Sequence, residues 1–213
     1  VRALARTTEL PTAEKKDSQG LCFIGKVRLP EFLQQQLKVK KGDIIEIPAD
    51  HIKCLETIEA TNTDIASPIA WTRHDGLAIG EHQGAHFFTV GQRRGLHVGG
   101  KPEPLFVLAK DVDENVLYVG QGESHPGLVR SALRMRMDEV HWIREDRSLA
   151  SGQSTRTFEF RFRYRQPLQQ GTLKRDGDFM TIIFDQPQTG IAAGQFAAWY
   201  DADECVGSGV ISD

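Results

Sequence analysis

The stretch Thr157–Gln166 reads TFEFRFRYRQ and alternates aromatic with charged or polar side chains without a break. Because successive side chains of a β-strand point to opposite faces, this period of two predicts a strand whose aromatic face is buried. Short runs of the same kind, separated by turn residues, fill the C-terminal half of the chain and predict a small barrel or sandwich. The predicted strands are residues 133–137, 140–143, 154–164, 171–174, 179–184, 197–200 and 206–211.

Upstream of this region the pattern mixes helix and strand. A short amphipathic helix is expected after Pro30, and residues 48–76 are interpreted as an insertion that is partly helical at 50–60. Strands are expected at residues 44–47, 86–90, 105–108 and 116–119. The predicted fold class is therefore mostly β with minor α: a small central α+β domain followed by a C-terminal β-barrel.

Composition excludes several classes of protein. The chain of 213 residues carries 26 Lys and Arg against 29 Asp and Glu, a net charge of −3, so nucleic-acid binding would have to use local basic clusters. Three cysteines at positions 22, 54 and 205 form no disulfide framework and favour a reducing compartment. No apolar run reaches the ~20 residues that span a membrane, so a soluble, cytoplasmic protein is expected. The histidine spacings predict no metal site.

Two basic features could contact phosphate. Arg161, Arg163 and Arg165 share one face of the predicted strand at a spacing of about 6.6 Å, close to the phosphate repeat of a nucleic-acid strand. Gly91–Gly100 is a basic, glycine-rich loop that could bring backbone N–H groups and guanidinium forks to an anion. A solvated charged face and a solvated turn are the alternative interpretations of these two segments.

Cys22 is the candidate reactive residue. It lies between Gly20 and Gly25, on backbone that can turn sharply, and Lys15 and Lys16 upstream would favour the thiolate. The alternative is a small buried hydrophobe beside Leu21 and Phe23, which is the commoner role of a lone cysteine. Cys54 is left unassigned, and Cys205 is expected in the core of a terminal strand.

Three motifs carry a resemblance to a known family. They are KKDSQGLCFIG at Lys15–Gly25, GEHQGAHFFTVGQRRGLHVGG at Gly80–Gly100 and GQFAAWYDADECVGSGVI at Gly194–Ile211. Together they resemble the tRNA-specific 2-thiouridylase family, whose members replace the C2 oxygen of the wobble uridine with sulfur. In that family the cysteine of the first motif carries a persulfide sulfur and forms a redox disulfide with a cysteine of another domain. The resemblance places this role on Cys22.

The resemblance also implies tRNA-contacting residues. The family's Arg-Tyr contact maps onto Arg163 and Tyr164, and its glutamine contact maps onto Gln195. The family has a proline before that Gly-Gln pair where this chain has Ala193, so the turn is less stiff here. The expected C-terminal domain is a β-barrel resembling those of translation factors.

The domain boundaries expected from the resemblance are 1–20 for the tail of an ATP-binding PP-loop domain, 21–125 for the central domain and 126–213 for the barrel. The chain is expected to be a C-terminal fragment that lacks the ATP-binding domain, binds no ATP and is inactive alone. The whole protein would be an ATP-dependent tRNA uridine 2-sulfurtransferase acting on uridine 34. Its partners would be tRNA and a sulfur donor such as a cysteine desulfurase or a sulfur relay protein. The alternative function is a non-catalytic RNA-binding module with an inert Cys22.

Overall fold

The computed structural model describes residues 2–14, 39–59, 63–149, 154–163 and 166–212. The chain forms two compact units, residues 1–39 and 40–213. In the first unit, helix α1 (Arg2–Thr7) has no buried residue, and Arg6 Nε contacts Glu14 Oε1 at 2.5 Å. No helix in the described ranges is long and apolar enough to cross a membrane. Cys22, Tyr164, Arg165 and the helix expected after Pro30 lie outside the described residues.

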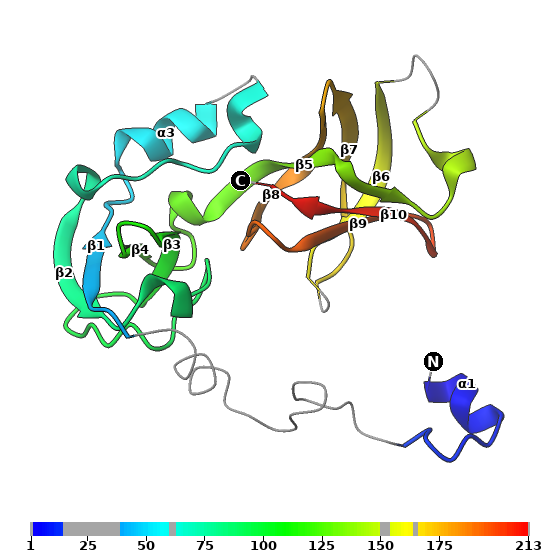
Figure 1. The fold of residues 1–213 in the computed structure, drawn as a ribbon, viewed down its shortest axis with the longest axis horizontal. Helices are drawn as coiled ribbons and strands as arrows, with labels where there is room; N and C mark the ends of the chain where they lie inside the picture. Colours follow the sequence, from blue (N-terminus) through cyan, green and yellow to red (C-terminus); the bar gives the residue numbers. More distant parts are fainter. Residues whose placement is uncertain (1, 15–38, 60–62, 150–153, 164–165, 213) are drawn as a thin grey trace. The chain divides into compact units, whose positions relative to one another are not determined.

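The first half of the second unit is built on a four-stranded sheet of order β2-β1-β4-β3 (Figure 1). Its strands are β1 (Gly42–Glu46), β2 (Leu77–His82), β3 (Leu105–Asp111) and β4 (Val116–Gln121). β1 is antiparallel to β2 and parallel to β4, and β3 and β4 form a hairpin. Helical segments lie between the strands: α3 (Ile52–Glu59), η1 (Thr63–Ala66), η2 (Arg73–Asp75), η3 (Ala85–Phe87) and η4 (Pro126–Leu128).

Alternation along β1 gives the sheet two buried faces. Ile45 packs in a cluster with Trp71 and the buried Cys54, whereas Ile44 packs on the other side with Phe88 and Leu96. Adjacent residues of a strand point to opposite faces, so both faces of this sheet are covered by the segments between the strands. The helix predicted at 50–60 is confirmed by α3.

Asn115 holds the edge of the sheet together. Its backbone is left-handed (φ 55°), a conformation that asparagine tolerates, and it closes the turn between β3 and β4. Its buried side-chain amide donates to the carbonyl oxygens of Lys40 and Lys41 at 3.0 and 2.9 Å. Its Oδ1 accepts from the backbone N–H of Ala85 at 3.0 Å, so one side chain links three chain segments.

The strand predicted at 86–90 is wrong. Ala85–Phe87 is a 3₁₀ turn, preceded by Gly84 at φ 145°, and Phe88 N donates back to Ala85 O at 3.2 Å. The aromatic side chains fill the sheet's second core cluster instead of joining a strand ladder. The strand of this region is β2 at Leu77–His82, which the sequence analysis did not predict.

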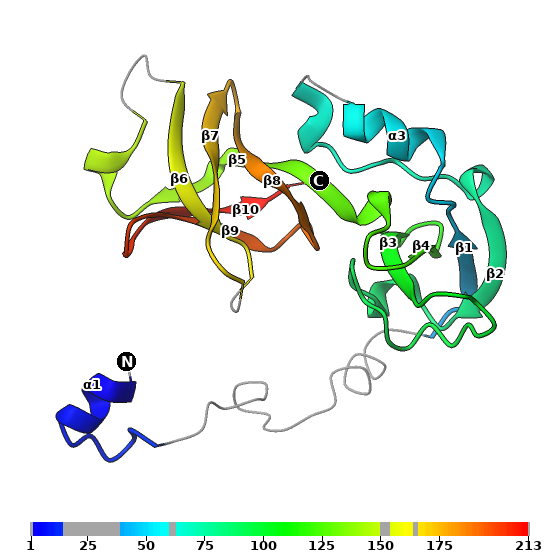
Figure 2. The ribbon, with the colours of Figure 1, turned by 180° about the vertical axis from the view of Figure 1, so that it is seen from behind.

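The second half of the unit is a closed six-stranded barrel of order β10-β5-β8-β7-β6-β9 (Figure 1; Figure 2). This confirms the predicted fold class. The strands are β5 (Val129–Trp142), β6 (Thr155–Arg161), β7 (Gln169–Asp176), β8 (Phe179–Thr189), β9 (Phe196–Asp201) and β10 (Glu204–Ile211), with η5 (Glu145–Arg147) after β5. The interior is packed by aromatic and branched side chains, among them the fully buried Phe160 and Trp199.

Three strand predictions change in detail. The runs at 133–137 and 140–143 belong to one strand, β5, which pairs with β10 on both sides of an irregularity between Met135 and Val140. The run predicted at 154–164 ends at Arg161. Cys205 is half-buried, and its neighbour Val206 takes the core position. The expectation of a core cysteine at 205 is therefore wrong.

Candidate nucleic-acid interface

The basic loop after Val90 is fixed to the sheet. Gly91 N donates to Val107 O at 2.7 Å, and Val107 N donates to Gln92 O at 3.0 Å. The Gln92 side chain accepts from Thr89 N at 3.1 Å and donates to Arg94 O at 2.8 Å. These bonds hold the start of the loop against β3.

Arg93 and Arg94 stand at the tip of this loop. Both are exposed, and neither makes an ion pair with another residue in the described part of the chain. Gly95 and His97 follow with left-handed backbone (φ 89° and 53°), which turns the chain sharply behind the two arginines. Unpaired guanidinium groups on a fixed loop provide a local positive potential in a chain of net negative charge.

Arg163 reaches the same place from the barrel. Its Nη2 donates to the carbonyl oxygen of Gly190 at 2.9 Å. A Cβ built on Gly91 would lie 3.6 Å from Arg163 Nη2 and 3.9 Å from Gly190 Cα, so the start of the basic loop adjoins this arginine. Two basic elements that are remote in sequence are thereby brought together.

Gln195 lies in the turn that follows Gly190. Gly194 has φ 78° and no atom within 4 Å of a built Cβ, so the turn is open on that side. Backbone bonds join the turn to Ile211, which accepts from Gly194 N at 2.9 Å and donates to Gln195 O at 2.8 Å. The side-chain Oε1 of Gln195 is buried and has no hydrogen-bond partner among the described atoms. An unsatisfied buried acceptor is costly, and a ligand donor could satisfy it.

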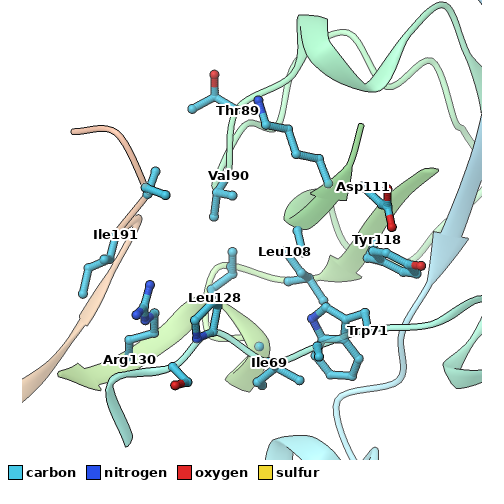
Figure 3. A pocket seen from close by; sticks show the side chains of 18 of the residues that line it. Ile69, Trp71, Thr89, Val90, Leu108, Asp111, Tyr118, Leu128, Arg130 and Ile191 are labelled. Atoms are coloured by element: carbon cyan, nitrogen blue, oxygen red, sulfur yellow. The ribbon is translucent and has the colours of Figure 1, made fainter. Parts of the chain in front are cut away.

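A pocket of about 830 Å³ lies beside this turn (Figure 3). The sheet contributes Thr89, Val90 and Leu108, and the barrel contributes Ile191 and Gln195. Trp71 and Leu128 are among its apolar lining residues (Figure 3), and the positive charges of Lys110 and Arg130 are balanced by the negative charges of Asp111 and Asp113. The pocket combines apolar walls with a few polar groups, which is the usual make-up of a ligand site.

The predicted row of evenly spaced arginines is not formed. β6 ends at Arg161, and the Arg161 guanidinium lies 5.8 Å from the Tyr200 ring centroid, on the strand's outer face. Arg163 comes after the strand and turns to Gly190. The structure therefore places Arg163 against Gly190 and beside Gly91, at the start of the basic loop, through tertiary contacts instead of strand periodicity.

The described cysteines offer no reactive thiol. Cys54 is fully buried in α3, and burial raises the pKa of its thiol, which disfavours the thiolate. Cys205 is half-buried, and its Sγ lies 3.9 Å from Gly207 O. Among the ranges described, no group of three His, Cys, Asp or Glu side chains is placed to hold a metal ion.

Sequence reasoning missed Gly190 and the pocket wall at Ile191. Gly190 has φ 73°, and a Cβ there would collide with the Arg163 guanidinium, so only glycine lets the arginine pack this closely. A glycine after a strand rich in polar residues was the available signal. Gly190 and Arg163 are 27 residues apart in the chain, so their contact could not be inferred from the sequence.

Three family models match the chain in sequence order. They are described as the tRNA methyl transferase HUP domain at residues 1–26, the tRNA methyl transferase PRC-barrel domain at 65–121 and the Aminomethyltransferase beta-barrel domain at 133–211. The last of these coincides with the closed barrel and ends at Ile211, the last residue of β10.

Curated proteins named tRNA-specific 2-thiouridylase MnmA match the whole chain. The protein of Christiangramia forsetii is 53% identical and that of Flavobacterium johnsoniae 51% identical, each over 100% of this chain and 55% of the relative. The Karelsulcia muelleri protein is 40% identical over 100% of this chain and 54% of its own length. The chain thus spans about half the length of these relatives. Over the residues that it comprises, the chain belongs to the tRNA-specific 2-thiouridylase family.

Proposed function

We propose that this chain is the tRNA-holding and sulfur-presenting part of an ATP-dependent tRNA uridine 2-sulfurtransferase that acts on wobble uridine 34. The observation that carries the proposal is the meeting of Arg163, the Gly190–Gln195 turn and the Gly91–Arg94 loop. Arg163, which the family resemblance implies as a tRNA contact, thus adjoins the loop that composition alone suggests as a phosphate contact. The names of relatives up to 53% identical support the same function.

The tRNA would be held by charge and by one amide. Arg93, Arg94 and Arg163 would each neutralise a backbone phosphate and release its counterions. The Gln195 amide would donate to and accept from a base edge or a ribose. This contact would orient the tRNA more than it would strengthen its binding. Tyr164 belongs to the same proposed contact because the family pattern places it beside Arg163.

Cys22 is proposed as the sulfur carrier. A donor such as a cysteine desulfurase or a sulfur relay protein would pass a sulfane sulfur to its thiolate and form a persulfide. A second cysteine thiolate, outside these residues, would attack the Sγ of Cys22, form a disulfide and expel hydrosulfide, which replaces the uridine C2 oxygen. The two thiols supply the two electrons that reduce the sulfur, so a thiol reductant must reopen the disulfide before the next turnover.

ATP would turn the C2 oxygen of the uridine into a leaving group. We assign it to no residue of this chain. By this proposal the 213 residues alone bind tRNA, but they do not bind ATP and do not thiolate the tRNA.

The catalytic part is tested in the protein at its natural full length, with a persulfide donor, ATP and substrate tRNA. We expect Cys22→Ser to abolish 2-thiouridine, measured by mass spectrometry of digested tRNA, and the half-buried Cys205→Ser to leave it unchanged. Thiolation by the Cys22 variant would remove the carrier role. Retained tRNA binding with no thiolation by the wild type would favour a non-catalytic RNA-binding module.

The tRNA-holding part is tested by affinity against salt concentration. Arg163→Ala should weaken binding and lower the slope of log K against log salt by about one. Arg175→Ala is the matched control, because Arg175 is also an exposed barrel arginine. The β6–β7 register sets Thr155 opposite Lys174 and Phe160 opposite Gln169, which places Arg175 toward the other end of the barrel from Arg163. If the two variants weaken tRNA binding equally, the loss would come from the lower net positive charge and not from a specific contact of Arg163.

A further inference from the structure

Phe196 is a large aromatic side chain left in solvent beside the proposed tRNA contacts. It begins β9, directly after Gln195, and it is 63% exposed, whereas the next residue, Ala197, is fully buried. An exposed phenylalanine on a barrel with a complete core adds nothing to the packing of that core.

Strand register defines what surrounds it. Phe196 pairs with Val210 on β10, and on the same outer face Ala198 pairs with Ser208. On the other side of β9, Ala198 pairs with Arg161 of β6. That pair is the last of the β6–β9 ladder, and Arg163, two residues beyond it, turns to Gly190. The outer-face neighbours that the register defines are Val210, the small residues Ala198 and Ser208, and the basic Arg161, and they leave the Phe196 ring largely exposed.

The outer face of β9 carries a second aromatic ring. Tyr200 is four residues from Phe196 and on the same face, about 13 Å away at strand rise. The Arg161 guanidinium lies 5.8 Å from the Tyr200 ring centroid. Aromatic rings on an open sheet face, with a basic side chain between them, are an arrangement by which proteins stack unpaired nucleobases, and Arg161 has that place here.

We infer that Phe196 is a stacking platform for an unpaired nucleobase of the bound tRNA, with Arg161 and Arg163 contacting the flanking phosphates. This rests on the proposed function and adds a contact of a different physical kind. The ring of Phe196 binds the flat face of a base, which every base has, so it contributes affinity with little sequence preference. The positive charge of Arg161 on the same outer face, in a chain of net charge −3, favours RNA over an apolar protein surface as the occupant.

The test measures tRNA affinity of the full-length protein as a function of salt. We expect Phe196→Ala to raise Kd by about fivefold or more, up to about 100-fold, without changing the salt slope, because stacking releases no counterions. Phe196→Leu should lose most of the same affinity, since it keeps apolar volume without a π-face. Phe196→Trp should keep or improve it.

Ile143→Ala is the control, because Ile143 is 56% exposed on the same barrel. Its N–H bonds to Val206 O, whereas Phe196 pairs with Val210, so it lies toward the other end of β10. Unchanged affinity of Phe196→Ala, while Arg163→Ala weakens binding, would overturn the platform and leave the proposed function intact. If neither variant weakens binding, the proposed function itself fails. A change in sedimentation of Phe196→Ala with unaltered tRNA affinity would identify a protein contact and also overturn the platform.

Discussion

Arg163 rests on Gly190, with its Nη2 bonded to the Gly190 carbonyl oxygen at 2.9 Å and its guanidinium occupying the space of a missing Cβ. The glycine thus supplies both an acceptor and room, and it fixes the direction of an arginine that follows the end of β6. Because Gly91 adjoins the same guanidinium, one interaction positions the charge where the basic loop begins.

Gly190→Ala should therefore cost stability and tRNA affinity together. The left-handed backbone alone costs about 1 kcal/mol for alanine, and the Arg163 guanidinium must also move away from the added Cβ and lose its hydrogen bond to Gly190 O. Gly177→Ala is the control, since Gly177 is also left-handed (φ 57°) but has no atom within 4 Å of a built Cβ. Urea unfolding should show the larger loss for Gly190→Ala, and adding Arg163→Ala should recover the excess. Equal losses in the two single variants would mean that the packing on Gly190 contributes nothing.

Gln195→Met should separate function from stability. The side chains are similar in size, and methionine removes a buried oxygen that has no partner among the described atoms. We expect the free energy of unfolding to stay the same or to rise by up to about 1 kcal/mol, and tRNA affinity to fall. A destabilised variant would indicate that the amide oxygen has a structural partner.

The three cysteines should differ in their rates of alkylation at neutral pH. Cys54 is fully buried with a raised thiol pKa, so iodoacetamide should leave it unmodified in the native protein. Cys205 is half-buried and should react slowly. Cys22, if it carries sulfur, should react first. Peptide mass spectrometry over a time course gives the order, and a Cys22 as inert as Cys54 would contradict its proposed role.

His125 should make stability depend on pH. It is buried, its Nε2 lies 3.1 Å from Ile47 O, and its Nδ1 accepts from Gly127 N at 3.1 Å. The neutral ring satisfies both contacts, and burial lowers its pKa. Because the unfolded histidine titrates at about 6.5, the unfolded chain binds more protons below that pH, and stability falls as the pH falls.

Urea unfolding of the wild type between pH 8 and 5 measures this effect. His125→Asn should be less stable at pH 8, but its stability should decline less toward pH 5. The slope should not vanish, because burial also lowers the pKa of His82. An identical slope in the variant and the wild type would exclude His125 as its source.

The barrel was predictable because its signal is local. Phe158, Phe160 and Phe162 alternate with polar residues, and period-two burial needs no knowledge of the partner strands. The hairpin of β3 and β4 was predictable for the same reason, since Asn115 supplies the left-handed turn. The prediction of a strand at 86–90 was wrong because it relied on the preference of aromatic residues for strands. In the structure a turn follows Gly84, and Phe88 is buried in a core cluster of the sheet.

The site was predictable only in its parts. Arg163 and Gln195 came from the family resemblance, but the approach of Arg163 to Gly91 depends on contacts across more than 70 residues of chain. Periodicity suggested a row of arginines, and the end of β6 at Arg161 prevented it. The exposure of Phe196 could not be read from the sequence, because an alternating aromatic is buried or exposed according to the register of its neighbours.

The place of β1 inside the four-stranded sheet limits how the protein can be shortened. This strand separates β2 from β4, although it precedes residue 65, where the match to the PRC-barrel model begins. A version trimmed to that match would lack β1, the strand that pairs with β4 at Leu117 and Val119. The edges of β2 and β4 that face β1 would then have unpaired backbone groups. Such a truncated polypeptide should aggregate, and autonomous expression of this region requires a start upstream of Gly42.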